Sequence, residues 1–238
     1  MHSSKDFDRG EVPKVHSSKD FDSGAFWEQR YKVGGNSGEG SYGELAEHKA
    51  RYLNDFVARK KLQNVIEFGC GDGNQLSLAK YERYNGVDVS SFVVQKNREK
   101  FSADKSKTFV ALAEYDEARN ARQHDLALSL DVIYHLVEDD VFSAYMARLF
   151  SAPRCWVVIY STAFDEMGAR HVRHRDFRRW VSVHAPDWKL IEHMENPFPE
   201  KSKADFFAYK LVTGVDSSDC GAEQEPSKVR LGCIGSTG

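Results

Sequence analysis

The amino-acid sequence predicts an α/β fold, a doubly wound, seven-stranded and mostly parallel sheet with an antiparallel edge strand. Two observations predict it. Apolar segments of strand length alternate with helical patterns, and the first of these strands runs into a glycine-rich turn. Such alternation is typical of a parallel sheet with helices on both faces. A chain of 238 residues is long enough for one such domain with an ample core.

The predicted elements follow from residue spacing. Apolar residues recur at helical intervals from Leu45 to Val57 and predict an amphipathic helix at 44–61. Runs of β-branched, aromatic and aliphatic residues predict the strands, and the last two strands form a hairpin at the antiparallel edge. The predicted strands are 64–68, 83–89, 108–112, 125–130, 155–160, 189–194 and 206–212, and further helices are predicted at 90–101, 113–122 and 139–150.

The two ends of the chain differ from its middle. The segment His2–Asp8 recurs as 16–22, and from about residue 215 the composition becomes polar without periodicity. We therefore expect a disordered tail at 1–25 that carries a short duplication, a single catalytic domain at 26–213 and a disordered tail at 214–238.

Charge and hydropathy exclude several classes of protein. The net charge of −3 gives no reason to expect a nucleic-acid partner. No apolar run is long enough to span a bilayer, and the first residues lack the apolar core of a secretory signal, so we expect a cytoplasmic protein without a membrane partner. The four cysteines form no C-x-x-C pair, and no metal site is predicted.

A glycine run after the first strand is the most informative motif. Glu67 precedes Gly69, Gly71 and Gly73, which stand at every second position, and Asp88 ends the next strand about 20 positions later. Glycine lets the backbone approach a ligand closely. An acidic residue at the end of the following strand is placed to bind ribose hydroxyls. Together these features predict a pocket for an adenosine-bearing cofactor.

The spacing of the glycines favours one cofactor over another. A dinucleotide fingerprint is G-x-G-x-x-G, whereas this loop is G-x-G-x-G with Glu67 before it and Asp72 inside it. Both carboxylates would repel a pyrophosphate. The pattern resembles motif I of the class I S-adenosylmethionine-dependent methyltransferases. That resemblance extends over about residues 26–212 and implies S-adenosyl-L-methionine as the cofactor.

The resemblance also implies roles for individual residues. Glu67 and the loop residues Gly69, Gly71, Asp72, Gly73 and Asn74 would lie near the methionine part, Asp88 at the ribose, and Val89 and Glu114 at the adenine. Glu114 has an alternative role as an acid that interacts with a helix dipole. Tyr31 and Asp131 are two further expected cofactor contacts. A glycine-rich segment that follows Trp27 and Tyr31 resembles the lid of many methyltransferases, and a flexible linker is the alternative.

The end of the fourth strand faces the transferred methyl group in this family. Here it reads Asp131-Val132-Ile133-Tyr134-His135, without the prolines typical of enzymes that methylate planar amino groups. His135 is a candidate general base, or it packs under the cofactor with one ring nitrogen bonded to the backbone.

A cluster that contains His171, His174 and Arg175 lies where the family commonly places residues that select the substrate. These side chains are candidates for binding an anionic group, or they form a solvated basic helix face.

We therefore predict a methyltransferase that acts on a small-molecule or sugar-containing acceptor such as a glycan precursor. A non-catalytic binding protein for S-adenosylmethionine or a nucleoside is one alternative. A nicotinamide-dependent oxidoreductase is a second, and the glycine spacing argues against it.

Overall fold

A computed structural model describes residues 21–212 of the chain. Most of the two predicted tails, and nearly all of the duplicated segment, lie outside these residues. The first described helix, α1, begins at Ser23 and ends at Lys32, so regular structure starts three residues before the expected domain boundary at residue 26.

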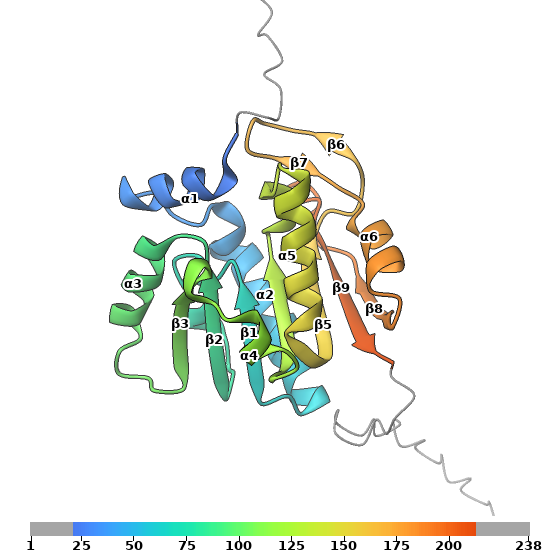
Figure 1. Ribbon diagram of the computed structural model, residues 1–238, viewed down its shortest axis with the longest axis horizontal. Coiled ribbons are helices and arrows are strands. Elements are labelled where there is room, and N and C mark those ends of the chain that lie inside the picture. The colour runs from blue at the N-terminus through green and yellow to red at the C-terminus, as the bar shows by residue number, and fades with distance from the viewer. Residues whose placement is uncertain (1–20, 213–238) are drawn as a thin grey trace, which may run out of the picture.

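One seven-stranded sheet organises the domain, in the order β3-β2-β1-β4-β5-β9-β8 (Figure 1). The strands β1 to β5 pair in parallel, and β9 pairs antiparallel with both β5 and β8. The predicted fold class is thus confirmed, with β9 as the antiparallel strand next to the outermost strand, β8. The strand bounds are β1 Asn64–Phe68, β2 Arg83–Asp88, β3 Lys107–Ala111, β4 His124–Leu130, β5 Pro153–Ser161, β8 Trp188–Met194 and β9 Asp205–Leu211.

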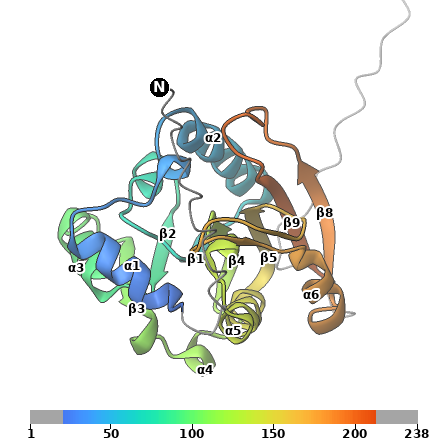
Figure 2. The same cartoon turned by 90° about the horizontal axis from the view of Figure 1, so that it is seen from above.

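Alternate residues of the central strands build two cores, one on each face of the sheet. Val65 of β1 packs under α2 (Gly43–Lys60), beside Leu53 and Phe56 of that helix. Its neighbour Ile66 points to the opposite face, toward Met146 of α5 (Asp139–Ser151) and α6 (Phe177–His184). Successive side chains of a strand point to opposite faces, so a strand that is buried on both faces reads as a continuous apolar run. Figure 2 shows α2 on one side of the sheet and α5 and α6 on the other.

The strand ends set the place of the functional site. The parallel strands all end at the same edge of the sheet, and α1 lies across that edge in Figure 1. Helix α3 (Ser91–Lys100) follows β2 at the same edge, and η3 (Gln75–Leu78) follows the turn after β1. Ligands of open parallel sheets bind at this edge, where the strand order reverses. Here the reversal lies between β1 and β4.

One local prediction was wrong. In place of a helix at 113–122, the chain forms the short η4 (Leu112–Glu114) and then α4 (Glu117–Asn120). Asp116 stands between them in an extended conformation and caps α4 through a hydrogen bond from Arg119 N, and a helix cannot run through a residue with that backbone. The basic segment before α6 forms a hairpin of β6 (Glu166–Met167) and β7 (Arg173–His174), so the alternative of a solvated basic helix face does not hold for His171 and His174.

No helix within residues 21–212 is both long and apolar enough to cross a membrane.

Candidate functional site

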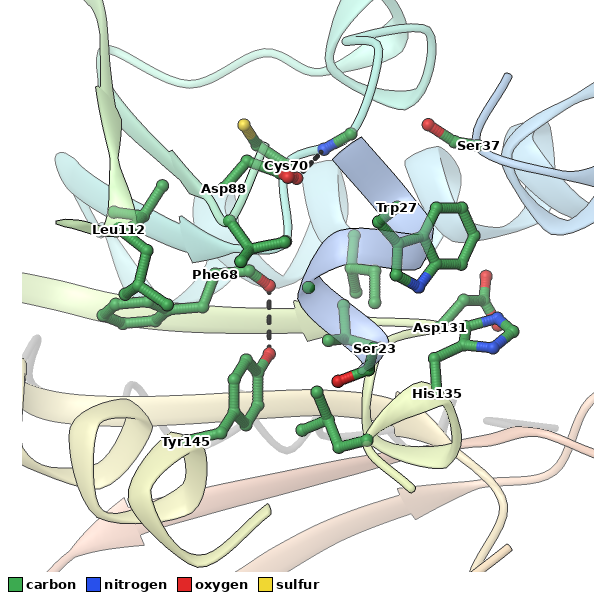
Figure 3. Close-up of a pocket in the computed structure, with 18 of the residues that line it drawn as sticks. Ser23, Trp27, Ser37, Phe68, Cys70, Asp88, Leu112, Asp131, His135 and Tyr145 are labelled. Atoms are coloured by element: carbon green, nitrogen blue, oxygen red, sulfur yellow. Dashed lines mark hydrogen bonds between the residues drawn. The ribbon is translucent and has the colours of Figure 1, made fainter. Parts of the chain in front are cut away.

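A cavity of about 420 Å³ lies at the carboxyl ends of β1, β2 and β4, beneath α1. This volume falls within the range of small-molecule sites. Figure 3 shows Asp88 and Leu112 at one end of the cavity and Asp131 and His135 at the other, with Trp27 of α1 beside His135. Two of the charged side chains that line it are cationic, Lys49 and Arg148, and six are carboxylates: Asp22, Glu67, Asp72, Asp88, Asp131 and Glu138. The cavity therefore favours a ligand with positive charge.

The glycine loop forms the wall of the cavity next to β1. Gly69, Gly71 and Gly73 have φ angles of 80°, 55° and 68°, which only glycine adopts at little cost. A Cβ at Gly69 would collide with Val132, and one at Gly71 would collide with Ser37. Gly69 and Gly71 line the cavity, so a ligand can approach their backbone. Gly73 packs against α3, where a Cβ would lie 2.6 Å from Asn97 Oδ1.

Asp88 joins the second strand to this loop. Its Oδ2 accepts a hydrogen bond from Gly71 N at 2.9 Å, and its Oδ1 accepts one from Ser90 N at 2.9 Å. The side chain is buried and lines the cavity. Burial raises the pKa of Asp88 to about 6, against the lowering effect of the two N–H donors. Each carboxylate oxygen keeps a lone pair for a further donor such as a ribose hydroxyl.

Glu67 lies on the floor of the same cavity. It is buried in β1, and its Oε2 accepts a hydrogen bond from Tyr84 O–H at 2.7 Å. Burial raises the pKa of Glu67 to about 7, and the charge of Asp88 adds to this effect. The bond from Tyr84 and the charge of Lys49 act in the opposite direction. The pKa of Glu67 therefore lies near neutral pH.

Two other predicted residues of the loop hold the N-terminal segment in place. Asp72 Oδ2 accepts hydrogen bonds from Ser37 N at 2.8 Å and from Tyr42 O–H at 2.9 Å. Asn74 Nδ2 donates to Ser41 O at 2.7 Å. Asp72 lines the cavity, whereas Asn74 and Gly73 do not. The main contacts of Asp72 and Asn74 are thus with the glycine-rich segment that covers the site.

Tyr31 and Val89 reach the cavity, and Glu114 does not. Tyr31 is buried, and its hydroxyl lies 3.1 Å from Ser37 Oγ. Glu114 is exposed and pairs with Arg98 at 3.3 Å. Leu112, two residues earlier, faces the cavity at this end in its place.

Asp131 stands at the other end, directly after β4. Its φ of 60° is rare for a residue with a side chain. Its Oδ2 accepts a hydrogen bond from the buried Lys49 Nζ at 2.5 Å, and its Oδ1 accepts one from Tyr134 O–H at 2.8 Å. Backbone strain of this kind gathers at functional sites.

His135 lines the same end and belongs to an aromatic stack. Its Nδ1 lies 3.0 Å from His171 O, which can only accept, so Nδ1 carries the proton and Nε2 has the lone pair. The ring stacks on His171 with centroids 5.6 Å apart and meets Trp27 edge-on at 4.9 Å. Burial lowers the pKa of His135 to about 4. Its backbone bond agrees with the packing alternative, and its place in the cavity leaves Nε2 available to a ligand.

The three predicted substrate residues occupy different environments, and none of them lines the cavity. His171 touches the cavity wall through His135. His174 Nδ1 lies 2.8 Å from Thr162 Oγ1. Arg175 is buried, donates to Val137 O at 2.7 Å and pairs with Asp139 at 2.9 Å. Arg175 therefore fixes the segment after β4 through contacts within the protein.

Lys49 was missed by the sequence predictions. It lies on the buried stripe of α2, four residues after Leu45 and four before Leu53, and its side chain is fully buried. A lysine on the apolar stripe of an amphipathic helix is a signal that could have identified it, because a charged residue is rarely buried unless it is paired. Tyr145 of α5 was also missed. Its hydroxyl bonds Phe68 O and Ser129 Oγ beneath the cavity.

The raised pKa of Glu67 has a consequence for stability. Between the unfolded pKa of 4.5 and the folded pKa of about 7, the folded protein binds more protons at this site than the unfolded protein. The contribution of Glu67 to the free energy of unfolding therefore falls as pH rises through this interval. We expect the free energy of unfolding of Glu67→Gln, measured by urea denaturation, to rise relative to that of the wild type as pH increases across the interval. The expected rise is on the order of 1–3 kcal/mol.

Glu114→Gln is the matched control for this measurement, because it makes the same change at an exposed site. It should leave the pH dependence unchanged. If the free energies of unfolding of Glu67→Gln and the wild type differed by the same amount at every pH, a proton held at Glu67 would be contradicted.

Comparison with known proteins places the chain in a family. Residues 42–203 match the sequence family described as "Methyltransferase domain". No curated protein sequence matches the chain.

Among solved structures, the chain is similar to the N-methyltransferase NodS from Bradyrhizobium japonicum WM9 in complex with S-adenosyl-L-homocysteine (SAH). The TM-score is 0.61 and the identity is 14%, over 81% of this chain and 100% of that one. Magnesium protoporphyrin IX methyltransferase (ChlM) from Synechocystis PCC 6803, with bound SAH, has a TM-score of 0.56 and 16% identity, over 79% of this chain and 94% of that one. The methyltransferase domain of bacterial CtHen1-C has a TM-score of 0.58 and 21% identity, over 71% of this chain and 100% of that one.

These identities show a common fold. The family match covers most of the chain, and the strand order and glycine loop agree with the resemblance found in the sequence. The chain therefore belongs to the methyltransferase-domain family, with the fold of class I S-adenosylmethionine-dependent methyltransferases.

Proposed function

We propose that the protein binds S-adenosyl-L-methionine in this cavity and transfers its methyl group to a small-molecule or sugar-containing acceptor. The observation that carries the proposal is the buried carboxylate of Asp88, which ends β2 and accepts a hydrogen bond from Gly71 N of the glycine loop. This arrangement supports a ribose-binding role for Asp88, because the carboxylate lies beside a backbone that a ligand can approach.

The charges in the cavity fit this cofactor. A sulfonium and an ammonium are both cationic, and six carboxylates line the cavity against two cationic side chains. Glu67 and Asp88 are both buried there, where Coulomb interactions are stronger than in water. A pyrophosphate would be repelled by the same groups, which supports S-adenosylmethionine over a nicotinamide dinucleotide.

Each end of the cavity has its own proposed role. Asp88 accepts hydrogen bonds from the ribose hydroxyls, while Leu112 and Val89 contact the adenine. Gly69 and Gly71 let the amino-acid part approach the loop. The cofactor, when bound, supplies an electrophilic methyl group, and we place that group toward Asp131 and His135.

His135 would orient the acceptor. The bond to His171 O fixes its tautomer, so Nε2 accepts a hydrogen bond from an O–H or N–H group. The low pKa of His135 makes it a weak base, which favours a nucleophile that already has a free lone pair. Trp27 and Tyr31 exclude water above the site, and alignment of the reacting groups is the main contribution of the protein to a displacement of this kind. Of the three predicted substrate residues, His171 is the one we place at the acceptor, because it stacks on His135.

Asp88→Asn tests the orientation of the cofactor. The charge-assisted hydrogen bonds to the ribose are lost, so we expect the Kd for S-adenosylhomocysteine, measured by calorimetric titration, to rise about 10- to 100-fold. Glu114→Gln changes a second predicted acidic residue that lies outside the cavity, and it should leave the Kd unchanged. Equal effects of the two substitutions on this Kd would show that the cofactor does not bind at Asp88.

Methyl transfer itself is tested with S-adenosylmethionine that carries a labelled methyl group, incubated with fractions of a cell extract. We expect label in the small-molecule fraction, and we expect His135→Gln to lower the rate without changing the Kd for S-adenosylhomocysteine. Tight binding with no transfer to any fraction would instead support the non-catalytic alternative. Affinity for NAD in place of the sulfur nucleosides would support an oxidoreductase.

A further inference from the structure

Two arginines flank the aromatic stack that contains His135. Arg30 comes from the last turn of α1, and Arg170 from the turn that joins β6 to β7. The hairpin and α1 stand at the same edge of the sheet (Figure 1). We propose that Arg30 and Arg170 bind an anionic group of the methyl acceptor, a phosphate or a carboxylate. The inference rests on the proposed function, because it names the chemical class of the acceptor that His135 would orient.

A column of three rings connects the cavity to both arginines. His135 lines the cavity, and His171 stacks on it with centroids 5.6 Å apart. Phe26 of α1 stacks in turn on His171, with centroids 4.9 Å apart. The interplanar angles are 11° and 17°, and stacked pairs at such distances are favourable. An acceptor oriented by His135 Nε2 would thus extend along this column, across the contact between the hairpin and α1.

Arg30 lies beside the column with donors to spare. Its guanidinium carbon is 5.5 Å from the centroid of the Trp27 ring, which meets His135 edge-on. Its Nε donates to Asn36 O at 2.7 Å. Within residues 21–212, the N–H groups of its two Nη atoms make no hydrogen bond and its charge has no carboxylate partner. The paired donors of a guanidinium match the oxygens of a phosphate or a carboxylate.

Arg170 lies at the Phe26 end of the same column. Its guanidinium carbon is 5.8 Å from the centroid of the Phe21 ring, and that ring lies 5.6 Å from the ring of Phe26. In the described part of the chain Arg170 has no ion pair either. Two unpaired guanidinium groups therefore approach one column from the two elements that meet there.

The charges beside the column are opposite to those in the cavity. Six carboxylates and two cationic side chains line the cavity, which suits a cationic cofactor. Burial lowers the pKa of both His135 and His171, and the positive charge of Arg30 acts in the same direction on each. The guanidinium therefore lies near two imidazoles that stay neutral. Glu28 of α1 is bound to Ser90 Oγ and Lys32.

This separation of charge has a consequence for the two substrates. A cationic cofactor in the cavity attracts an anionic acceptor beside it, while Arg30 and Arg170 attract the acceptor to the column. The proposed subsite would therefore favour anionic acceptors over neutral ones of the same shape.

Methyl phosphate and acetate are the smallest probes of the two sources of negative charge. We expect at least one of them to shift the ring resonances of His171, followed by proton–nitrogen NMR on the full chain and assigned with His171→Gln. The anion with the lower Kd identifies the source. Arg30→Gln should raise that Kd about tenfold, because charge-assisted hydrogen bonds are lost. Arg170→Gln changes an exposed side chain and should raise it about threefold.

Two further variants serve as controls. Arg51→Gln makes the same change in charge on α2, at an exposed arginine 3.9 Å from Glu47, and it should leave the Kd unchanged. Arg30→Lys keeps the charge without the paired donors, and it should recover part of the affinity that Arg30→Gln loses. None of the arginine variants should change the Kd for S-adenosylhomocysteine.

The labelled product of methyl transfer provides a second readout. We expect it to be retained on an anion-exchange column at neutral pH. Treatment with a phosphatase should abolish retention if the group is a phosphate monoester and leave it unchanged if the group is a carboxylate.

Three results would overturn the inference while the proposed function stands. They are a labelled product without negative charge, a His171 ring that responds to neither anion, and equal Kd values for the anion in Arg30→Gln and Arg51→Gln. If the protein neither binds S-adenosylhomocysteine nor transfers label, the proposed function itself fails, and the acceptor role of the arginines fails with it.

Discussion

The hydrogen bond from Gly71 N to Asp88 Oδ2 is the interaction on which the rest of the site depends. It fixes the glycine loop after β1 against the end of β2, and it brings a carboxylate into a place where burial raises its pKa to about 6. The loop accepts this position because Gly69 and Gly71 adopt positive φ angles. A side chain at either residue would collide with Val132 or Ser37, so neither the wall of the cavity nor its cover could pack as they do.

The cover of the cavity is tied to the same loop. Asp72 binds Ser37 and Tyr42 of the N-terminal segment, while Glu28 of α1 accepts a hydrogen bond from Ser90 Oγ at the start of α3. Ser23 N donates to Glu138 at the start of α5. The helix α1 is thus joined to α3 and α5, and the segment after it is joined to the glycine loop. Together they cover the cavity. A covered site excludes water, which strengthens the electrostatic interactions inside it.

The sequence predicted the strand bounds closely, but it predicted only some of the residues that line the two ends of the cavity. Strand β1 has the predicted bounds, and the others differ by up to two residues at an end, because long apolar runs bounded by turns leave few alternatives. Asp88 and the glycines could be predicted since their spacing is a local pattern. The side-chain partner of Asp72 could not, because Ser37 lies 35 residues away.

Tertiary contacts also decided which charged residues reach the site. Arg175 appeared free to bind an anion in the sequence, but the carbonyl of Val137 and the carboxylate of Asp139 occupy it. Glu114 ends the short helical turn η4 after β3, where it is exposed and pairs with Arg98, and Asp116 then starts a new helix. Lys49 was missed because it lies within an otherwise regular amphipathic pattern. Its partner Asp131, which balances its charge, is 82 residues away in the sequence.

A crystal structure of the protein with S-adenosylhomocysteine is the most direct measurement of the central claim, that this cavity holds the cofactor in one orientation. The account predicts electron density with the ribose hydroxyls on the Asp88 carboxylate and the amino-acid part beside Gly69 and Gly71. Density in the reverse orientation, or at another place on the molecule, would contradict it.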